Sequence, residues 1–138
     1  TNMTGMSLEY ITQDYQPLVK LIEQSVGHHY STQEKVVGTW IDGKPIYRKV
    51  VDFGALPNAT TKLVDHGITD VDTWVNLNVI ANTSTKSGIR LPFADTSLAT
   101  QSISCYATVT KVGVGTGSTN RSDYSSCYFV LEYTKTTD

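Results

Sequence analysis

The side chains best suited to chemistry in this chain are aromatic and charged residues in or beside its turn-rich segments. Sugars bind proteins by placing C–H groups on aromatic faces and by hydrogen-bonding their hydroxyls to planar polar groups. Loops carry such contacts most often, which favours the segments 82–88, 94–97 and 115–123. For any single aromatic residue, packing in the core or at an interface is the stronger interpretation. The candidate ligand-binding residues are Arg90, Asp95, Arg121, Asp123 and Tyr124.

Catalysis finds little support in the sequence. The carboxylates are scattered, and the cluster Asp65, Asp70 and Asp72 lies in a segment rich in turn-forming residues. No nucleophile-elbow, zinc-protease or phosphate-loop motif occurs. The segment 113–117, Gly-Val-Gly-Thr-Gly, lacks dinucleotide-binding spacing and a following helix, so it predicts a flexible hairpin loop. We expect no enzymatic activity and no cofactor.

Histidines and cysteines give no clear metal signature. His28 and His29 are adjacent, so their side chains diverge in an extended chain, and a solvated linker is favoured over a metal site. His66 is expected to shape the loop before Gly67. Cys105 and Cys127 lie on the apolar faces of predicted strands, where two buried thiols are favoured over a cross-strand disulfide.

Size and composition bound the class of protein. The chain has 138 residues, enough for one compact domain and an appendage. Its formal net charge of −2 gives no electrostatic reason to bind nucleic acid or an anionic membrane. No run of about 18 apolar residues suggests a transmembrane helix. Because the chain begins with Thr1 and shows no signal peptide, we expect a fragment of a longer polypeptide or a processed product.

Residues 1–30 predict a helical stem or linker. Pro17 disfavours helical geometry at Gln16, so we expect a short turn or helix near 7–15 and a helix from Pro17 to Val26, capped by Gly27. The apolar stripe packs either on a sheet or between subunits. It repeats at helical spacing through Leu8, Ile11, Tyr15, Leu18, Leu21, Ile22 and Val26.

Residues 31–138 predict an all-β domain, an antiparallel β-sandwich or jelly-roll-like fold. Short apolar runs alternate with turn clusters rich in Gly, Asn, Asp and Ser. In the run 73–81, Val75, Leu77 and Val79 are expected on the core face, and Asn76 and Asn78 on the solvent-exposed face. The run 99–114 reads as one strand, softly broken at 111–113. The remaining expected strands are 62–66, 89–93 and 124–135.

The segment 36–51 predicts a β-hairpin with a two-residue Asp42-Gly43 loop of type I′. This register places Trp40 opposite Pro45 and stacks Trp40, Pro45 and Tyr47 on one face. Because proline has no N–H to donate, Pro45 indicates an unpaired edge near the turn. Val37, Ile41 and Ile46 would gather on the other face.

Several motifs occur in order across residues 30–138. They are YSTQEKVVGTWIDGKPIYRK at 30–49, LPNAT at 56–60 with HGI at 66–68, LPF at 91–93, TGSTNRSDY at 116–124 and VLEYTKTTD at 130–138. Together they resemble the C-terminal domains of bacteriophage and prophage tail proteins. The chain departs from that pattern by an insertion of Thr119 and Asn120 before Arg121, which is expected to alter a loop and keep the fold.

The resemblance implies a receptor-binding domain of a tail fibre, tail spike or baseplate-associated protein, located in the virion tail. It implies a homotrimer whose stem packs the Leu18, Leu21 and Ile22 stripes together. Expected partners are bacterial surface polysaccharide or teichoic acid and other tail or baseplate proteins. The alternatives are a structural trimerisation or capping domain, a carbohydrate-binding module of a secreted bacterial protein, and a small glycan hydrolase. Fold-level analogy alone does not choose among them.

Overall fold

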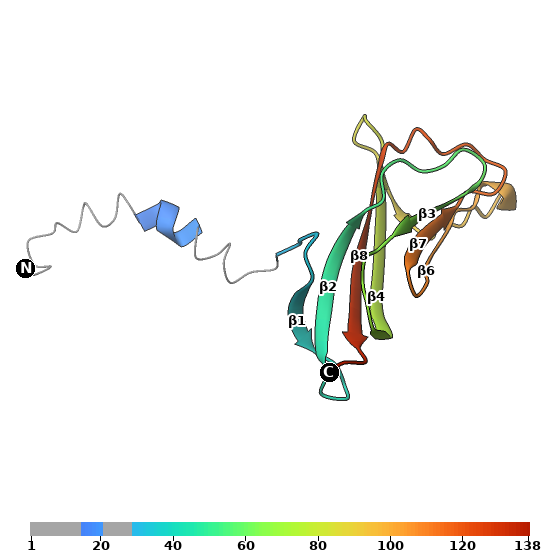
Figure 1. Cartoon of the computed structure of the whole chain (residues 1–138). Helices are drawn as coiled ribbons and strands as arrows, with labels where there is room; N and C mark the ends of the chain where they lie inside the picture. Colours follow the sequence, from blue (N-terminus) through green and yellow to red (C-terminus); the bar gives the residue numbers. More distant parts are fainter. Residues whose placement is uncertain (1–14, 21–28) are drawn as a thin grey trace, which may run out of the picture. The chain divides into compact units, whose positions relative to one another are not determined.

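A computed structural model describes residues 15–20 and 29–138 (Figure 1). The chain divides into two compact units, Thr1–Tyr30 and Ser31–Asp138. Within the first unit, residues 15–20 are helical, and Leu18 is 54% exposed. Gln16 is helical too, so the expected break there is wrong; the bias against helical geometry before proline is not a prohibition. Leu21, Ile22, Gly27, His28 and the other expected stem residues in 1–14 and 21–28 lie outside the described residues.

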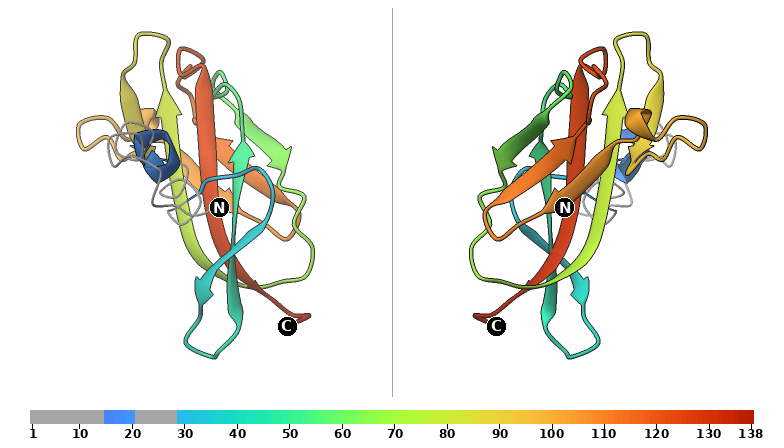
Figure 2. Two further views of the ribbon diagram at one scale, coloured as in Figure 1. Left: turned by 90° about the vertical axis from the view of Figure 1, so that its left-hand side faces the viewer. Right: turned by 90° about the vertical axis from the view of Figure 1, so that its right-hand side faces the viewer.

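The second unit is a sandwich of two antiparallel sheets, which confirms the predicted fold class. The large sheet has the strand order β1-β2-β8-β4-β5, and the small sheet has the order β3-β7-β6. Figure 2 shows β6 and β7, in orange, lying across β8, in red. The strands are β1 (Lys35–Thr39), β2 (Pro45–Asp52), β3 (Thr61–Asp65), β4 (Val71–Asn82), β5 (Gly88–Leu91), β6 (Ser104–Ala107), β7 (Lys111–Gly115) and β8 (Ser126–Lys135).

The core lies between the sheets and is centred on β8. Its alternate residues Cys127, Phe129, Leu131 and Tyr133 are fully buried, as period-two alternation requires for a half-buried strand. The Phe129 ring contacts the Phe53 ring at a centroid distance of 5.3 Å. Both cysteines are free, as predicted, but only Cys127 is buried, and Cys105 is half-buried.

The pattern of β4 is only partly as predicted. Asn76 and Asn78 pair with Glu132 and Val130 on the face away from the core, as expected. Leu77 pairs with buried Leu131 but is 39% exposed, so its assignment to the core is wrong. The reason is its position, because β5 pairs only with 79–82 of β4 and leaves the preceding residues at a sheet edge.

The β1–β2 hairpin forms, but its predicted loop is wrong. The Trp40 N–H donates to the Lys44 carbonyl at 2.8 Å, and the Gly43 N–H donates to the Trp40 carbonyl at 2.9 Å. These bonds enclose a three-residue loop, 41–43, in which only Gly43 has a positive φ, 89°. A type I′ turn needs positive φ at both central residues, whereas a type I turn with a glycine bulge needs it only at the last loop residue. Asp42 Oδ1 accepts the Lys44 N–H at 2.9 Å and supports this turn.

The longer loop shifts the register, so the predicted stack of Trp40, Pro45 and Tyr47 does not form. Pro45 pairs with Thr39, and strand alternation then places Trp40 on the face opposite to Pro45 and Tyr47. Tyr47 instead stacks on Tyr133, with ring centroids 6.0 Å apart. The pairing of β2 with β8 begins at Tyr47, so Pro45 has no partner on the β8 side, as its missing N–H predicts.

The run 99–114 is two strands and a 3₁₀ helix, Ala99–Gln101 (η2), rather than one strand. The chain turns after β6, where the Thr108 N–H donates to the Lys111 carbonyl at 2.7 Å and Thr108 Oγ1 accepts the Lys111 N–H at 3.0 Å. Lys111 therefore begins β7 and does not interrupt a strand. Gly113 and Gly115 lie in β7, the central strand of the small sheet, so the predicted loop at 113–117 is wrong for 113–115, and only 116 and 117 lie outside the strand.

Candidate functional site

The outer face of the small sheet presents side chains in rows across three strands. The register pairs Gly115 with Thr61 of β3 and with Ser104 of β6, which makes one row. The next row is Leu63, Gly113 and Tyr106. The intervening residues of β7, Val112 and Val114, are fully buried, so these rows face away from the core.

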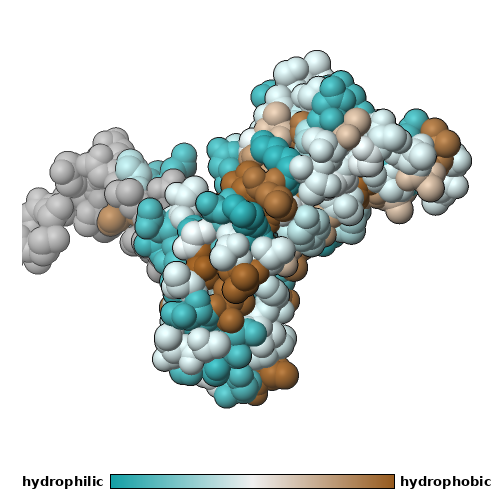
Figure 3. Space-filling model, turned by 45° about the vertical axis from the view of Figure 1, so that its right-hand side comes forward, coloured by the Kyte–Doolittle hydropathy of each residue, from teal (hydrophilic) through white to brown (hydrophobic). Residues whose placement is uncertain are grey.

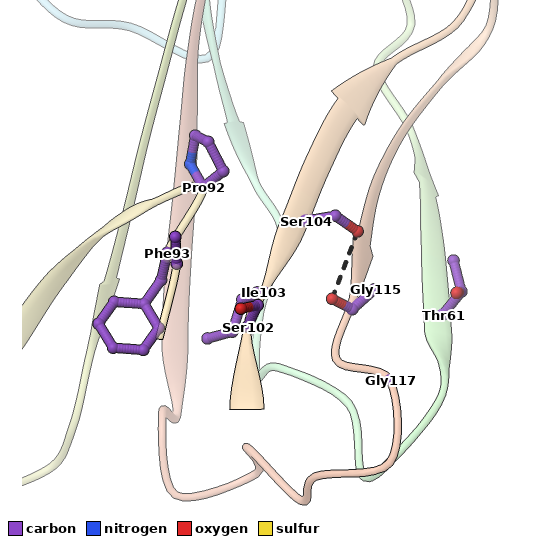
Figure 4. Close-up of a pocket in the computed structure, with 9 residues that line it drawn as sticks. Thr61, Pro92, Phe93, Ser102, Ile103, Ser104, Gly115 and Gly117 are labelled. Atoms are coloured by element: carbon purple, nitrogen blue, oxygen red, sulfur yellow. Dashed lines mark hydrogen bonds between the residues drawn. The ribbon is translucent and has the colours of Figure 1, made fainter. Parts of the chain in front are cut away.

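A shallow groove of about 540 Å³ crosses the first row, and we call it the β7 groove. Figure 4 shows Pro92 and Phe93 on one side of Ser102, with Gly115 and Thr61 on the other. A β-bridge between Phe93 and Ile103 holds the two sides together, with N–H···O distances of 3.0 and 2.8 Å. The lining residues are Thr61, Pro92, Phe93, Ala94, Ser102, Ile103, Ser104, Gly115 and Gly117.

Gly115 lets two hydroxyls approach each other over the floor of the β7 groove. A Cβ atom at this position would lie 2.8 Å from Ser104 Oγ and 3.3 Å from Thr61 Oγ1. Because Gly115 has no side chain, these hydroxyls can lie where a side chain would otherwise stand. Ser104 Oγ donates a long hydrogen bond of 3.5 Å to the Gly115 carbonyl, shown dashed in Figure 4, and a hydroxyl in that position keeps its acceptor capacity.

An aromatic surface adjoins the groove in the next row. A Cβ atom on Gly113 would lie 2.6 Å from Tyr106 Cζ and 2.8 Å from Leu63 Cδ2, so these two side chains cover the glycine. Tyr106 is nevertheless 40% exposed, which leaves part of its ring to solvent. A glycine in a central strand is normally a weak point, and here the neighbouring side chains compensate for it.

No ionisable residue is among those that line the β7 groove. Figure 3 shows one side of the molecule, where apolar patches in brown are separated by pale residues of intermediate hydropathy and by teal hydrophilic residues. The predicted ligand-binding residues nearest the groove are Arg121 and Asp95, and both make hydrogen bonds within the protein. The Arg121 guanidinium lies 5.6 Å from the Phe93 ring centroid and donates to the Gln101 carbonyl, while its Nε is buried without a hydrogen-bond partner. Asp95 accepts the backbone N–H groups of Ser97 and Leu98.

The structure does not bring the five predicted ligand-binding residues together. Arg121 and Asp95 border the groove, since Arg121 contacts Phe93 and the Asp95 N–H donates to Ser102 Oγ at 3.1 Å. Arg90 lies on β5 of the other sheet and donates to Asn78 Oδ1 at 2.9 Å. Asp123 is exposed in a turn, and Tyr124 packs against the core.

Sequence reasoning missed the three hydroxyl residues of the groove. Ser102 and Ser104 alternate with Ile103, a buried residue, and continue to Tyr106 on the same face. This period-two pattern was the available signal. Thr61 carries no such signal, because only its pairing with Gly115 brings it to the groove.

The remaining polar candidates serve the fold. His66 is buried, its Nδ1 accepts the Ile68 N–H at 3.0 Å, and its Nε2 lies 2.9 Å from the Thr108 carbonyl, so Nε2 carries the proton. This confirms its predicted role in shaping the loop. The turn carboxylates have separate partners, with Asp65 bound to Lys111 and Asp72 to Lys44.

The hydrogen bond and the positive charge of Lys111 lower the pKa of the Asp65 carboxyl. Within residues 15–20 and 29–138, no group of three or more His, Cys, Asp or Glu side chains could hold a metal ion. No helix in this described part of the chain is long and apolar enough to cross a membrane.

Comparison with known proteins finds no matching family model, no matching curated protein and no matching solved structure. The chemistry of the site must therefore follow from its own lining. Hydroxyls and apolar ring surfaces can hydrogen-bond and stack a sugar. The lining residues include no histidine or carboxylate that could act as a general base.

Proposed function

We propose that this chain carries the receptor-binding domain of a bacteriophage or prophage tail protein. It attaches to glycan on the bacterial surface as a homotrimer, in the virion tail, without altering the glycan chemically. The observation that carries the proposal is the β7 groove, in which Thr61, Ser102 and Ser104 supply hydroxyls beside Phe93 and Pro92. Such a combination suits a sugar, which needs both hydrogen bonds and apolar contact.

The position of the motifs separates most of the frame from the hydroxyl residues of the binding surface. The segment 30–49 contains β1 and the beginning of β2, and the segment 130–138 contains most of β8. These strands are neighbours in the large sheet. The hydroxyl residues Thr61, Ser102 and Ser104 lie outside every motif that carries the resemblance to tail proteins, whereas Pro92 and Phe93 belong to the motif at 91–93. Binding surfaces placed on a constant scaffold are the common arrangement in proteins.

The proposed trimer would convert weak sugar contacts into useful avidity, because linked sites bind with a high effective concentration. Leu18, which is 54% exposed on the short helix, would be covered by the other stems. Light scattering of the full chain at micromolar concentration tests this part. A mass of one chain would refute the trimer.

Adhesion is tested by binding of the full chain to purified envelopes of candidate host bacteria. The double variant Thr61→Val and Ser104→Ala removes two hydroxyls and adds no polar or larger side chain. We expect this variant to lose binding while its circular dichroism is unchanged, and Ser84→Ala in the distant 82–88 loop to bind as the unchanged protein does. Equal binding by the double variant would refute the groove as the receptor site. Release of reducing sugars would refute the non-enzymatic part of the proposal.

A second candidate is a structural trimerisation or capping domain of a tail fibre. The exposed apolar residues of the β1 edge and its loop favour it, since Val36 is 62% and Ile41 is 89% exposed. An open strand edge with apolar side chains is suited to pairing with another chain. A stable trimer that binds no bacterial envelope would support this candidate over adhesion.

A further inference from the structure

We infer that the β7 groove selects uncharged sugar residues over phosphorylated or acidic ones. The inference rests on the proposed function and names the ligand class of the same site. Its first basis is the lining itself, in which every side chain is neutral. A groove of about 540 Å³ is within the range of about 300–1,000 Å³ usual for small-ligand sites.

The second basis is that the cations nearest the groove are directed to partners within the protein. Lys62 follows Thr61, but its Nζ points inward and donates to the Phe53 and Ala55 carbonyls at 2.9 and 2.8 Å. Lys111, at the start of β7, forms an ion pair with Asp65. Arg121 lies on the Phe93 ring and donates to Gln101.

An anionic sugar in the groove would therefore lose water without gaining a direct ion pair, because no lining residue is a cation and the Arg121 guanidinium is directed to the Gln101 carbonyl and the Phe93 ring. Removing a charged group from water is costly unless an opposite charge replaces the lost solvation. The carboxylate of Asp95 beside Ala94 adds a negative charge near one wall. A neutral sugar meets no such penalty, because hydroxyls such as those of Ser102 and Ser104 replace its hydrogen bonds to water.

Gly115 allows the hydroxyls of this site to take their positions. A methyl group at this position would displace them, because its Cβ atom would lie 2.8 Å from Ser104 Oγ and 3.3 Å from Thr61 Oγ1. The Ser104 hydroxyl can rotate away, so Gly115→Ala is expected to fold. Gly38→Ala in β1 is a matched control, since its Cβ would meet only Ile46 Cδ1 at 3.9 Å.

The experiment measures binding of the full chain to pairs of immobilised bacterial-type oligosaccharides that differ only in one phosphate or carboxylate. We expect the neutral members to bind at least about ten times more tightly than their charged partners. A tenfold ratio of affinities is a difference of about 1.4 kcal/mol in binding free energy. Because no ion pair forms, raising NaCl from low to physiological concentration should leave neutral binding nearly unchanged. Gly115→Ala should reduce the affinity for the neutral oligosaccharides by about tenfold or more, and Gly38→Ala should leave that affinity unchanged.

The outcomes separate the inference from the function on which it rests. Preferred binding of charged members, weakened by salt, would overturn the inference and leave adhesion intact. Neutral binding that survives both Gly115→Ala and Thr61→Val would place the ligand outside the groove and overturn the inference as well. Absence of binding to every oligosaccharide and to bacterial envelopes would contradict the proposed function itself.

Discussion

Tyr133→Phe is the substitution whose effect follows most directly from the structure. Tyr133 is fully buried in β8, stacks on Tyr47 and meets Trp74 edge to face at 5.7 Å. Its hydroxyl donates to Glu34 Oε1 at 2.5 Å, and Glu34 Oε2 binds Lys135 Nζ at 2.6 Å. The hydroxyl therefore attaches the segment before β1 to the centre of the large sheet.

The magnitude can be worked from these contacts. Phenylalanine keeps the ring and leaves no cavity larger than the lost oxygen, so only the hydrogen bond is removed. Such a bond to a charged acceptor contributes about 1.5–3 kcal/mol. Glu34 keeps Lys135 as a partner and its side chain is 30% exposed, so it is not left as a buried unpaired charge. We therefore expect a loss of about 1.5 kcal/mol in the free energy of unfolding at pH 7.

Alkaline pH gives a second readout of the same bond. Burial, followed by the hydrogen bond to Glu34, raises the pKa of the Tyr133 phenol above its ordinary value of 10.0. The folded protein thus holds this proton more tightly than the unfolded chain. Its contribution to stability is complete below pH 10 and declines above it, by about 1.4 kcal/mol per pH unit for one proton. Burial also raises the pKa of the Cys127 thiol, to about 12, with the same sign.

The assay is urea unfolding at pH 7 and at steps up to pH 11. Tyr133→Phe should unfold at lower urea with an unchanged m-value, and its stability should decline less steeply above pH 10. Tyr128→Phe is the matched control, because Tyr128 is 42% exposed on the outer face of β8. A loss below about 0.5 kcal/mol at pH 7, or an alkaline decline equal to that of the unchanged protein, would refute the reasoning.

Three further predictions concern the small sheet and its core. Lys62→Met should lower the free energy of unfolding by about 1–3 kcal/mol, because it removes two hydrogen bonds to carbonyls. It should also increase aggregation, measured by light scattering, because an inward-pointing lysine protects the β3 edge from pairing with another chain. Gly113→Ala should lower the free energy of unfolding, measured with urea, by about 1–3 kcal/mol, because the new methyl group overlaps Tyr106. Adding Tyr106→Ala should recover part of that loss. If the effects of the two substitutions simply add, the two residues are not in contact. A thiol reagent at pH 8 should modify half-buried Cys105 well before Cys127, whose burial raises its thiol pKa to about 12, whereas equal rates in the folded protein would contradict this.

Much of the sandwich could be predicted because its strands carry strong local patterns. The alternation of Cys127, Phe129, Leu131 and Tyr133 identified a core-facing strand, and the Asp42-Gly43 pair identified the turn of a hairpin. The loop type was not predictable from that pair. It depends on the register of β2, which is held by burial of Tyr47 against Tyr133, and a one-residue change in loop length moves Trp40 to the other face.

The candidate site shows the limit of sequence reasoning most clearly. Its lining comes from four separate segments, around residues 61, 92–94, 102–104 and 115–117, which meet only through the strand order β3-β7-β6 and the bridge of Phe93 to Ile103. Charged residues stood out in the sequence, yet Arg121 and Asp95 use their polar groups within the protein. Serine and threonine are too common in this chain for single hydroxyls to indicate a site. Only the pairing of the strands brings these hydroxyls together.

By itself the sequence determined the all-β class, the approximate strands and the hairpin, because alternation and turn chemistry are local properties. Tertiary structure alone decided that Gly113 and Gly115 of the glycine-rich segment 113–117 lie in a central strand. Glycine favours loops when considered alone, and only the cover of Leu63 and Tyr106 over Gly113 makes a strand acceptable there. Gly115 of the same strand lets the Thr61 and Ser104 hydroxyls come together in the groove, so a residue that misled the sequence interpretation helps to form the site.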